Sequence, residues 1–134
     1  EGLGVTGAHE EFVSLLDLAP TVLDLAGTEI PDTYDGRSLL DLPAEDWRPD
    51  VTAEFHGHFF PIEQRMLRTD RYKLVATHDA DEPGELYDLE SDPEETTNRW
   101  TDPDYLDVKA RLLDRLAERM ARTADPLPER QSPW

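Results

Sequence analysis

Two histidines close together in an aromatic segment are the side chains of this sequence with the clearest capacity for chemistry. Residues 54–61 read Glu-Phe-His-Gly-His-Phe-Phe-Pro, which places His56 and His58 among phenylalanines. An imidazole can donate hydrogen bonds to anionic or hydroxyl oxygens, and an aromatic ring can pack on an apolar substrate face. The segment therefore predicts a substrate-binding loop at His56 and His58. Plain polar surface is the alternative interpretation.

The same two histidines also have the spacing of a metal-binding pair. Glu54, His78 or Asp79 could supply a third ligand, since two imidazoles and one carboxylate satisfy an open zinc site. The chain contains no cysteine, so a thiolate ligand is excluded. No additional motif closes the set, such as a helical histidine at a fixed spacing. We therefore expect no metal ligands in this chain.

A single cluster of basic residues could bind an anionic substrate. It consists of Arg65, Arg68, Arg71 and Lys73, in a chain that has 13 Lys and Arg against 31 Asp and Glu. Side chains alternate between the two faces of a strand, so Arg68 need not share a face with Arg65 or Arg71. Because carboxylate partners are abundant, the sequence favours internal salt bridges for this cluster.

The acidic composition restricts the possible partners. A formal net charge of −18 over 134 residues repels nucleic acid and anionic membranes. A disordered acidic tail is one interpretation, but three tryptophans and periodic Leu and Val runs favour a folded, halophilic protein. In molar salt the Debye length falls to about 3 Å, which would screen the self-repulsion of such a surface.

The sequence alone leaves two locations open for this protein. No apolar run approaches the roughly 20 residues that span a bilayer, and no signal-peptide pattern is present. The Gly-rich start without an initiator Met suggests a piece of a longer protein. In that case the absence of a signal says nothing about export, so the cytoplasm of a halophile and an exported location both fit.

The elements that must position these side chains begin with a strand and a helix. A short strand is expected at 12–15, followed by a helix that Asp17 caps, with Pro20 in its first turn and Gly27 at its end. Residues 28–49 contain Pro31, an Asp-Gly turn signal and another proline, which indicates a surface loop with one short helical turn.

The second half of the chain predicts a small sheet and a long helix. Strands are expected at 51–55, 64–69, 72–77 and 85–89, and their short separations favour antiparallel hairpins. A helix follows, with Asp102 as N-cap and Pro103 at its first position. Its apolar residues recur at a helical period, so one face should cover the sheet. The fold class is α+β.

Three blocks of this sequence, in this order, resemble the last part of the sulfatase family in the alkaline phosphatase superfamily. The first is 13–27, Val-Ser-Leu-Leu-Asp-Leu-Ala-Pro-Thr-Val-Leu-Asp-Leu-Ala-Gly, followed by Asp-Gly-Arg-Ser-Leu at 35–39. The second is 65–75, Arg-Met-Leu-Arg-Thr-Asp-Arg-Tyr-Lys-Leu-Val. The third is 85–98, with Glu-Leu-Tyr-Asp-Leu, Asp-Pro and Glu-x-x-Asn elements. The resemblance covers roughly residues 10–122.

The third block also has a structural interpretation that does not depend on the family. Asp92 and Pro93 start a turn, which Glu95 and Asn98 can pin through side-chain hydrogen bonds to backbone groups. These carboxylates are therefore expected to serve the scaffold and not catalysis.

The resemblance implies a division of the chain into three parts. Residues 1–50 would form the C-terminal end of the large α/β sulfatase domain and a connector, and residues 51–124 a small C-terminal α+β subdomain. Residues 125–134, which are Pro-rich, would form an extended tail. The role of the whole segment would be to complete the large domain and to wall the substrate cleft.

The resemblance further implies an enzyme whose catalytic residues lie elsewhere. Sulfatases hydrolyse sulfate esters or sulfamates with a formylglycine made in a Cys/Ser-x-Pro-x-Arg motif, assisted by a divalent cation, usually calcium. This chain has no cysteine and no serine in that motif. We expect no catalytic residue and no cofactor here, and an inactive chain in isolation. Calcium and the N-terminal catalytic part of the same protein would lie upstream.

The substrate would be a sulfated small molecule or glycan. Family members often carry a His-containing loop between the two domains at the rim of the substrate pocket, which is where His56 and His58 fall. Two other functions remain open: a phosphate or phosphonate ester hydrolase of the same superfamily, and a stand-alone acidic binding module without catalysis.

Overall fold

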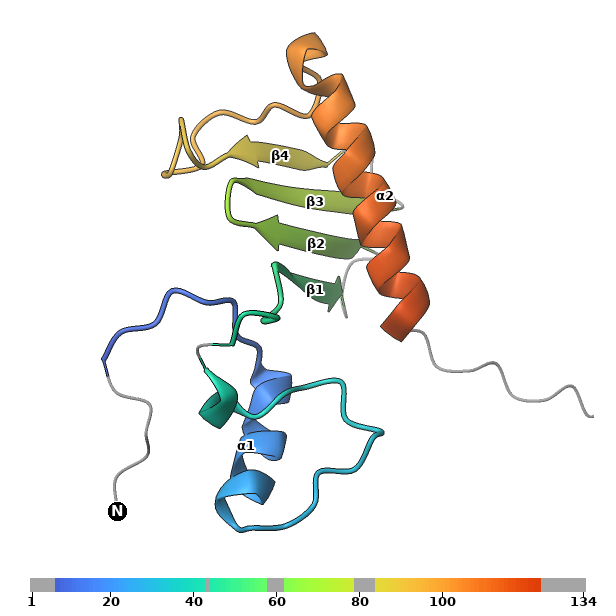
Figure 1. Cartoon of the computed structure of the whole chain (residues 1–134). Helices are drawn as coiled ribbons and strands as arrows, with labels where there is room; N and C mark the ends of the chain where they lie inside the picture. Colours follow the sequence, from blue (N-terminus) through green and yellow to red (C-terminus); the bar gives the residue numbers. More distant parts are fainter. Residues whose placement is uncertain (1–6, 43, 58–61, 79–83, 124–134) are drawn as a thin grey trace, which may run out of the picture.

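The computed structural model describes residues 7–42, 44–57, 62–78 and 84–123. A small N-terminal unit comes first, with the 3-10 helix η1 (Leu15–Asp17), the helix α1 (Leu18–Leu25) and the 3-10 helix η2 (Leu39–Asp41). A sheet of four strands follows, and the chain then passes through the 3-10 helix η3 (Pro103–Tyr105) into the helix α2 (Leu106–Thr123). Figure 1 shows the N-terminal unit beyond the β1 edge of the sheet.

The sheet is an antiparallel meander that follows the chain order. Its strands are β1 (Asp50–His56), β2 (Glu63–Thr69), β3 (Tyr72–His78) and β4 (Glu85–Asp88), arranged β1-β2-β3-β4. The short separations in the sequence thus produce hairpins, as predicted. α2 lies across the sheet (Figure 1). The predicted α+β class, with four antiparallel strands and a long C-terminal helix, is confirmed.

The core lies between the sheet and α2. Leu67, Leu74 and Leu86 are completely buried, and the strand register places them side by side in one row across β2, β3 and β4. Leu112 and Leu116 of α2 join the same cluster. Alternation in the strands and a helical period in α2 therefore direct leucines from both layers into one interior.

The start of the chain differs from the prediction. Residues 12–14 form no strand, and residues 15–17 form η1. A strand needs a neighbour to satisfy its backbone groups, and the described part of the chain offers none at this place. Pro20 does lie in the first turn of α1, and Gly27, with φ of +67°, follows the end of that helix as predicted.

The predicted cap at Asp17 is wrong in its detail. The Asp17 side chain makes no cap hydrogen bond to α1. It accepts instead from the backbone N–H of Ser14, whose own hydroxyl accepts from Leu16 N–H, so the two form a capping box around η1. At the other helix the prediction holds, since Asp102 caps η3 and Pro103 is its first residue.

The turn after β4 is pinned mainly as the sequence indicated. Asn98 accepts from Leu86 N–H at 3.0 Å and donates to Gly84 O at 3.0 Å. Asp92 accepts from the backbone N–H groups of Thr96 and Thr97. The prediction for Glu95 is wrong, because its side chain pairs with an amine of β3, as described below. These polar groups hold the loop against the last strand.

Candidate functional site

Of the two histidines predicted to bind substrate, the structure describes only His56. His56 is the last residue of β1, and its side chain is 61% exposed. His58 falls outside the described residues, as does Asp79. The site can therefore be built around His56, at the end of the sheet where β1 finishes and β2 begins.

Two glutamates flank the His56 imidazole. Nε2 lies 3.4 Å from Glu54 Oε2, and Nδ1 lies 3.8 Å from Glu63 Oε1. Arg65 adds a positive charge, with Nε 3.8 Å from Glu54 Oε1 and Nη2 3.9 Å from Glu63 Oε2. The register pairs Glu54 with Arg65 and His56 with Glu63, so all four side chains share one face. This group places the possible donors of His56 and Arg65 beside the acceptors of Glu54 and Glu63 on one face of the sheet.

A second histidine lies two strands away. The register pairs His56 with Glu63 and Glu63 with His78, which places the three residues in one row. His78 is exposed at the end of β3. Within the described ranges, however, no group of three or more His, Cys, Asp or Glu residues could hold a metal ion. The register therefore aligns two histidines and one glutamate at this end of the sheet.

Most residues of the basic cluster form ion pairs within the chain. Arg71 binds Asp88 and Glu90, and Lys73 Nζ lies 2.5 Å from Glu95 Oε2. Arg65 lies near the glutamates beside His56, although its Nε is buried without a hydrogen-bond partner. The prediction of internal salt bridges is confirmed for these three. Arg68 has no ion pair within the described ranges, and it lies on the opposite face from Arg65.

Three buried aspartates join elements that are distant in the sequence, and sequence analysis missed all three as junctions. Asp17 accepts from Arg48 Nη1 at 2.8 Å and Nη2 at 2.5 Å, and from Arg37 N–H at 2.9 Å. Burial by itself would raise the pKa of Asp17, but the hydrogen bonds from Arg48 and the backbone outweigh it, so the pKa is lowered. Asp17 is therefore an ionised structural group.

The other two aspartates anchor the sheet to α2 and to its own turn. Asp50, at the start of β1, pairs with Arg115 and Arg119 of α2. Asp88 accepts a two-pronged hydrogen bond from Arg71 and one from Tyr105 Oη at 3.1 Å. The hydrogen bond from Arg71 is the main cause that lowers the pKa of Asp88. Both carboxylates have their partners in place, which fits a structural role.

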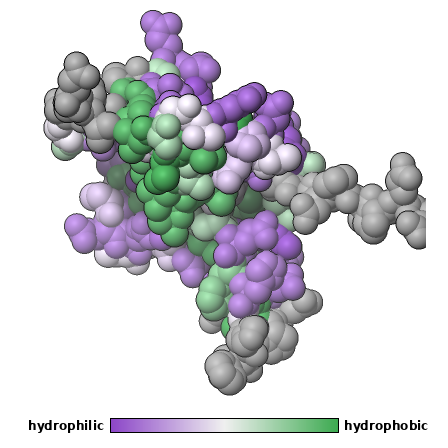
Figure 2. Space-filling model, turned by 90° about the horizontal axis from the view of Figure 1, so that it is seen from below, coloured by the Kyte–Doolittle hydropathy of each residue, from purple (hydrophilic) through white to green (hydrophobic). Residues whose placement is uncertain are grey.

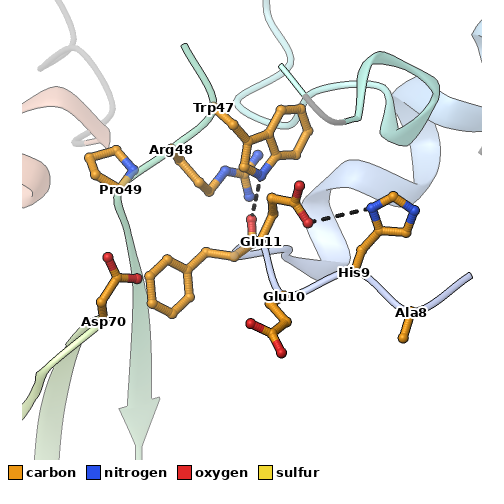
Figure 3. A pocket seen from close by; sticks show the side chains of 9 residues that line it. Ala8, His9, Glu10, Glu11, Trp47, Arg48, Pro49 and Asp70 are labelled. Atoms are coloured by element: carbon orange, nitrogen blue, oxygen red, sulfur yellow. Dashed lines mark hydrogen bonds and ion pairs between the residues drawn. The ribbon is translucent and has the colours of Figure 1, made fainter. Parts of the chain in front are cut away.

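A hollow of about 490 Å³ lies where the N-terminal segment passes the base of the sheet (Figure 3). It draws on three separate segments, so spacing in the sequence could not reveal it. Glu10, Glu11 and Asp70 line it, and the Arg48 guanidinium is engaged by Asp17. His9 Nδ1 lies 3.5 Å from Glu11 Oε2. With three carboxylates at its wall, this hollow is poorly suited to a sulfated or phosphorylated ligand.

Comparison with known proteins identifies the family. Residues 3–122 match the family described as N-sulphoglucosamine sulphohydrolase, C-terminal. The chain therefore belongs to this family and corresponds to the C-terminal portion of sulfatase-family proteins. No helix among the residues described here is long and apolar enough to cross a membrane.

Individual relatives from this and a related class of hydrolase share the same region. Arylsulfatase K of Homo sapiens is 40% identical over 97 residues, which cover 64% of this chain and 18% of the relative. A phosphonate monoester hydrolase of Agrobacterium radiobacter superposes with a TM-score of 0.73 and 29% identity, over 90% of this chain and 28% of that one. A structure solved with its substrate D-glucosamine-2-N,6-O-disulfate gives a TM-score of 0.74 and 26% identity, over 87% of this chain and 25% of that one.

The relatives are much longer than this chain. This chain spans between 18% and 28% of the length of these three relatives. The larger part of each relative has no counterpart in the sequence described here.

Proposed function

We propose that this chain serves as the C-terminal portion of a hydrolase that cleaves sulfate esters or sulfamates, where it completes the fold and forms one wall of the substrate cleft. The observation that carries the proposal is the family match over residues 3–122. The four-stranded sheet with its covering helix supplies a rigid platform for such a wall. A sulfated glycan is the substrate class that fits best, since one similar structure holds a disulfated glucosamine.

Catalysis belongs to an upstream part in this proposal. The sequence has no cysteine and no serine in the Cys/Ser-x-Pro-x-Arg motif that yields formylglycine in the family. The three buried aspartates form ion pairs with arginines, which fits a structural role. The divalent cation, expected to be calcium, would be bound by the catalytic part, and this chain alone would be inactive.

In the same proposal, His56 and His58 lie at the rim of the cleft and contact the substrate. The support for His56 is its exposure at the end of the sheet and its place between Glu54 and Glu63. A protonated or neutral imidazole can donate to a sulfate or sugar oxygen, and the glutamates can accept from sugar hydroxyls. His78, in the same row, would extend this contact.

The test measures hydrolysis of an aryl sulfate and of a sulfated glucosamine by the full-length protein from the source organism. A hydrogen bond to a charged group contributes about 1.5–3 kcal/mol. His56→Ala should therefore lower kcat/KM for the glucosamine substrate at least about tenfold, since 1.4 kcal/mol corresponds to a factor of ten. His9→Ala is the matched control, because His9 also pairs with a glutamate but lies in the N-terminal segment. Equal activities of the two variants would refute the rim position.

A phosphonate or phosphate ester hydrolase is the second candidate. It is supported by the similarity to the phosphonate monoester hydrolase, which covers 90% of this chain. The same full-length protein should be offered an aryl phosphonate monoester beside the aryl sulfate. A kcat/KM at least tenfold higher for the phosphonate would replace the sulfatase proposal with this one.

A further inference from the structure

A hollow between the sheet and α2 is lined by basic and apolar residues. It has a volume of about 260 Å³ and lies where the turn between β2 and β3 meets the helix. Its lining residues are Thr69, Tyr72, Val108, Arg111, Leu112 and Arg115. We call it the arginine pocket. Figure 1 shows α2 lying across the sheet above these strands.

The charge of the arginine pocket is opposite to that of the chain. No Asp or Glu is among the described residues that line it, although the chain has a net charge of −18. Three carboxylates line the hollow of about 490 Å³ described above. Asp35 and Asp50 line another of about 160 Å³, together with two arginines. Among these hollows, the arginine pocket is therefore the one that attracts an anion.

Both arginines of the pocket keep hydrogen-bond donors for a ligand. Arg111 is exposed, and within the described ranges it forms no ion pair or hydrogen bond. Arg115 pairs with Asp50, but Asp50 also pairs with Arg119, whose Nε lies 2.8 Å from Oδ1. One carboxylate thus faces two guanidinium groups, which leaves an excess of one positive charge. Each guanidinium has several N–H donors, so Arg115 is not saturated by a shared carboxylate.

The apolar wall of the pocket is fixed by the core. Leu112 is buried, and Tyr72 and Val108 are half-buried side chains that pack against the cluster between the sheet and α2. The Arg71 guanidinium lies 5.0 Å from the centroid of the Tyr72 ring and is itself held by Asp88, which sets the position of the ring. Sites for small molecules combine an apolar wall of this kind with a few polar groups that fix orientation.

We propose that the arginine pocket binds a small organic acid. Arg111 and Arg115 hold its carboxylate through charge-assisted hydrogen bonds, and the apolar wall covers a ring or a branched chain. The volume sets the size of the ligand. Pockets for drug-sized molecules measure about 300–1,000 Å³, so about 260 Å³ accommodates a single ring and not a glycan chain.

The arginine pocket is separate from the other surfaces of this protein. Thr69 lies six residues from Glu63 along β2, which puts the pocket about 20 Å from the His56 end of the sheet at about 3.4 Å per residue. Figure 2 shows hydrophobic side chains gathered over the N-terminal unit, where Leu15 and Val22 are exposed. That unit contributes no residue to the pocket. The inference therefore does not depend on the proposed hydrolase function.

The test is isothermal titration calorimetry of the full-length protein with benzoate, and with benzamide as a neutral ligand of the same size. Benzoate should bind at least about tenfold more tightly, because only the carboxylate gains charge-assisted hydrogen bonds from the arginines. Arg111→Gln should weaken benzoate binding at least about fivefold. Arg122→Gln is the matched control, since Arg122 is another exposed arginine of α2 but does not line the pocket. It should change the affinity less than about twofold.

Three results would overturn the proposal. The first is that benzoate does not bind the full-length protein. The second is that benzoate and benzamide bind equally well, which would mean that the arginines contribute nothing. The third is that Arg111→Gln and Arg122→Gln bind benzoate equally, which would place the ligand elsewhere, for example in the catalytic part. None of these results bears on whether the protein hydrolyses sulfate esters.

Discussion

Asp17→Asn tests the view that a buried carboxylate holds the N-terminal unit to the sheet. The Asp17 side chain is completely buried and receives hydrogen bonds from the Arg48 guanidinium, Ser14 N–H and Arg37 N–H. The amide keeps the size of the side chain but removes its charge and turns an NH₂ group toward donors. Removing one partner of a buried ion pair typically costs 3–5 kcal/mol. Because Arg48 is 18% exposed and can recruit water, we expect the lower end, about 3 kcal/mol.

The assay is urea unfolding of the 134-residue chain in concentrated KCl, followed by circular dichroism. Asp46→Asn is the control, since Asp46 forms an ion pair with Arg37 at 3.3 Å but is 82% exposed. An exposed pair contributes less than about 1 kcal/mol, so the control should change the free energy of unfolding only slightly. If the two variants lose the same stability, the structural role assigned to Asp17 is wrong.

Two further predictions use the same assay, and a third uses thermal melting followed by circular dichroism. Because the pKa of Asp17 is lowered in the folded state, the unfolded chain takes up this proton first on acidification. Asp17 therefore contributes its full share of the free energy of unfolding above about pH 4, and this share declines at lower pH. The difference in stability between the wild type and Asp17→Asn should shrink in acid. Equal differences at pH 3 and pH 7 would refute this. Gly84→Ala should destabilise the fold by about 2 kcal/mol or more, because Gly84 has φ of +120° and an added Cβ would lie 2.5 Å from Val75 O. Gly27→Ala should cost about 1 kcal/mol, because Gly27 has φ of +67° but open space around it. The reverse order of the two losses would contradict the packing described. Finally, the fold should be more stable in multimolar KCl than at about 0.1 M, and identical circular dichroism melting curves at both salt concentrations would contradict the screening argument.

The sequence predicted the second half of the fold well because its signals are local. Alternation around Leu67 and Leu74 and a helical leucine period from Leu106 onward are readable within a few residues. Short turns leave hairpins as the simplest connection. The predicted fold class is confirmed for these reasons, and the predicted family is confirmed by the match over residues 3–122.

The ion pairs that join the elements could not be predicted in the same way. Arg48 is 31 positions from Asp17, and Arg119 is 69 positions from Asp50. With 31 acidic residues, each arginine had many possible partners, and only the folded chain selects among them. The strand predicted at 12–15 is absent for a related reason: a strand needs a neighbouring strand, and a local sequence pattern does not show whether one is there.

Some residues of the candidate site could be selected from the sequence, and their substrate-binding role stays a prediction. The aromatic segment directed attention to His56, which the structure places among Glu54, Glu63 and Arg65 at the end of the sheet. The row with His78 depends on strand register and could not be derived from spacing alone. The role of His58 stays a prediction, since that residue falls outside the described ranges.

The most direct test of the central claim is the intact mass of the protein purified from its source organism, with peptide mapping of any sequence upstream of Glu1. If this chain is the C-terminal portion of a sulfatase, the mass will be several times that of 134 residues. One upstream peptide will then carry a formylglycine in the Cys/Ser-x-Pro-x-Arg motif. A mass equal to 134 residues would contradict the account and favour a stand-alone acidic binding module.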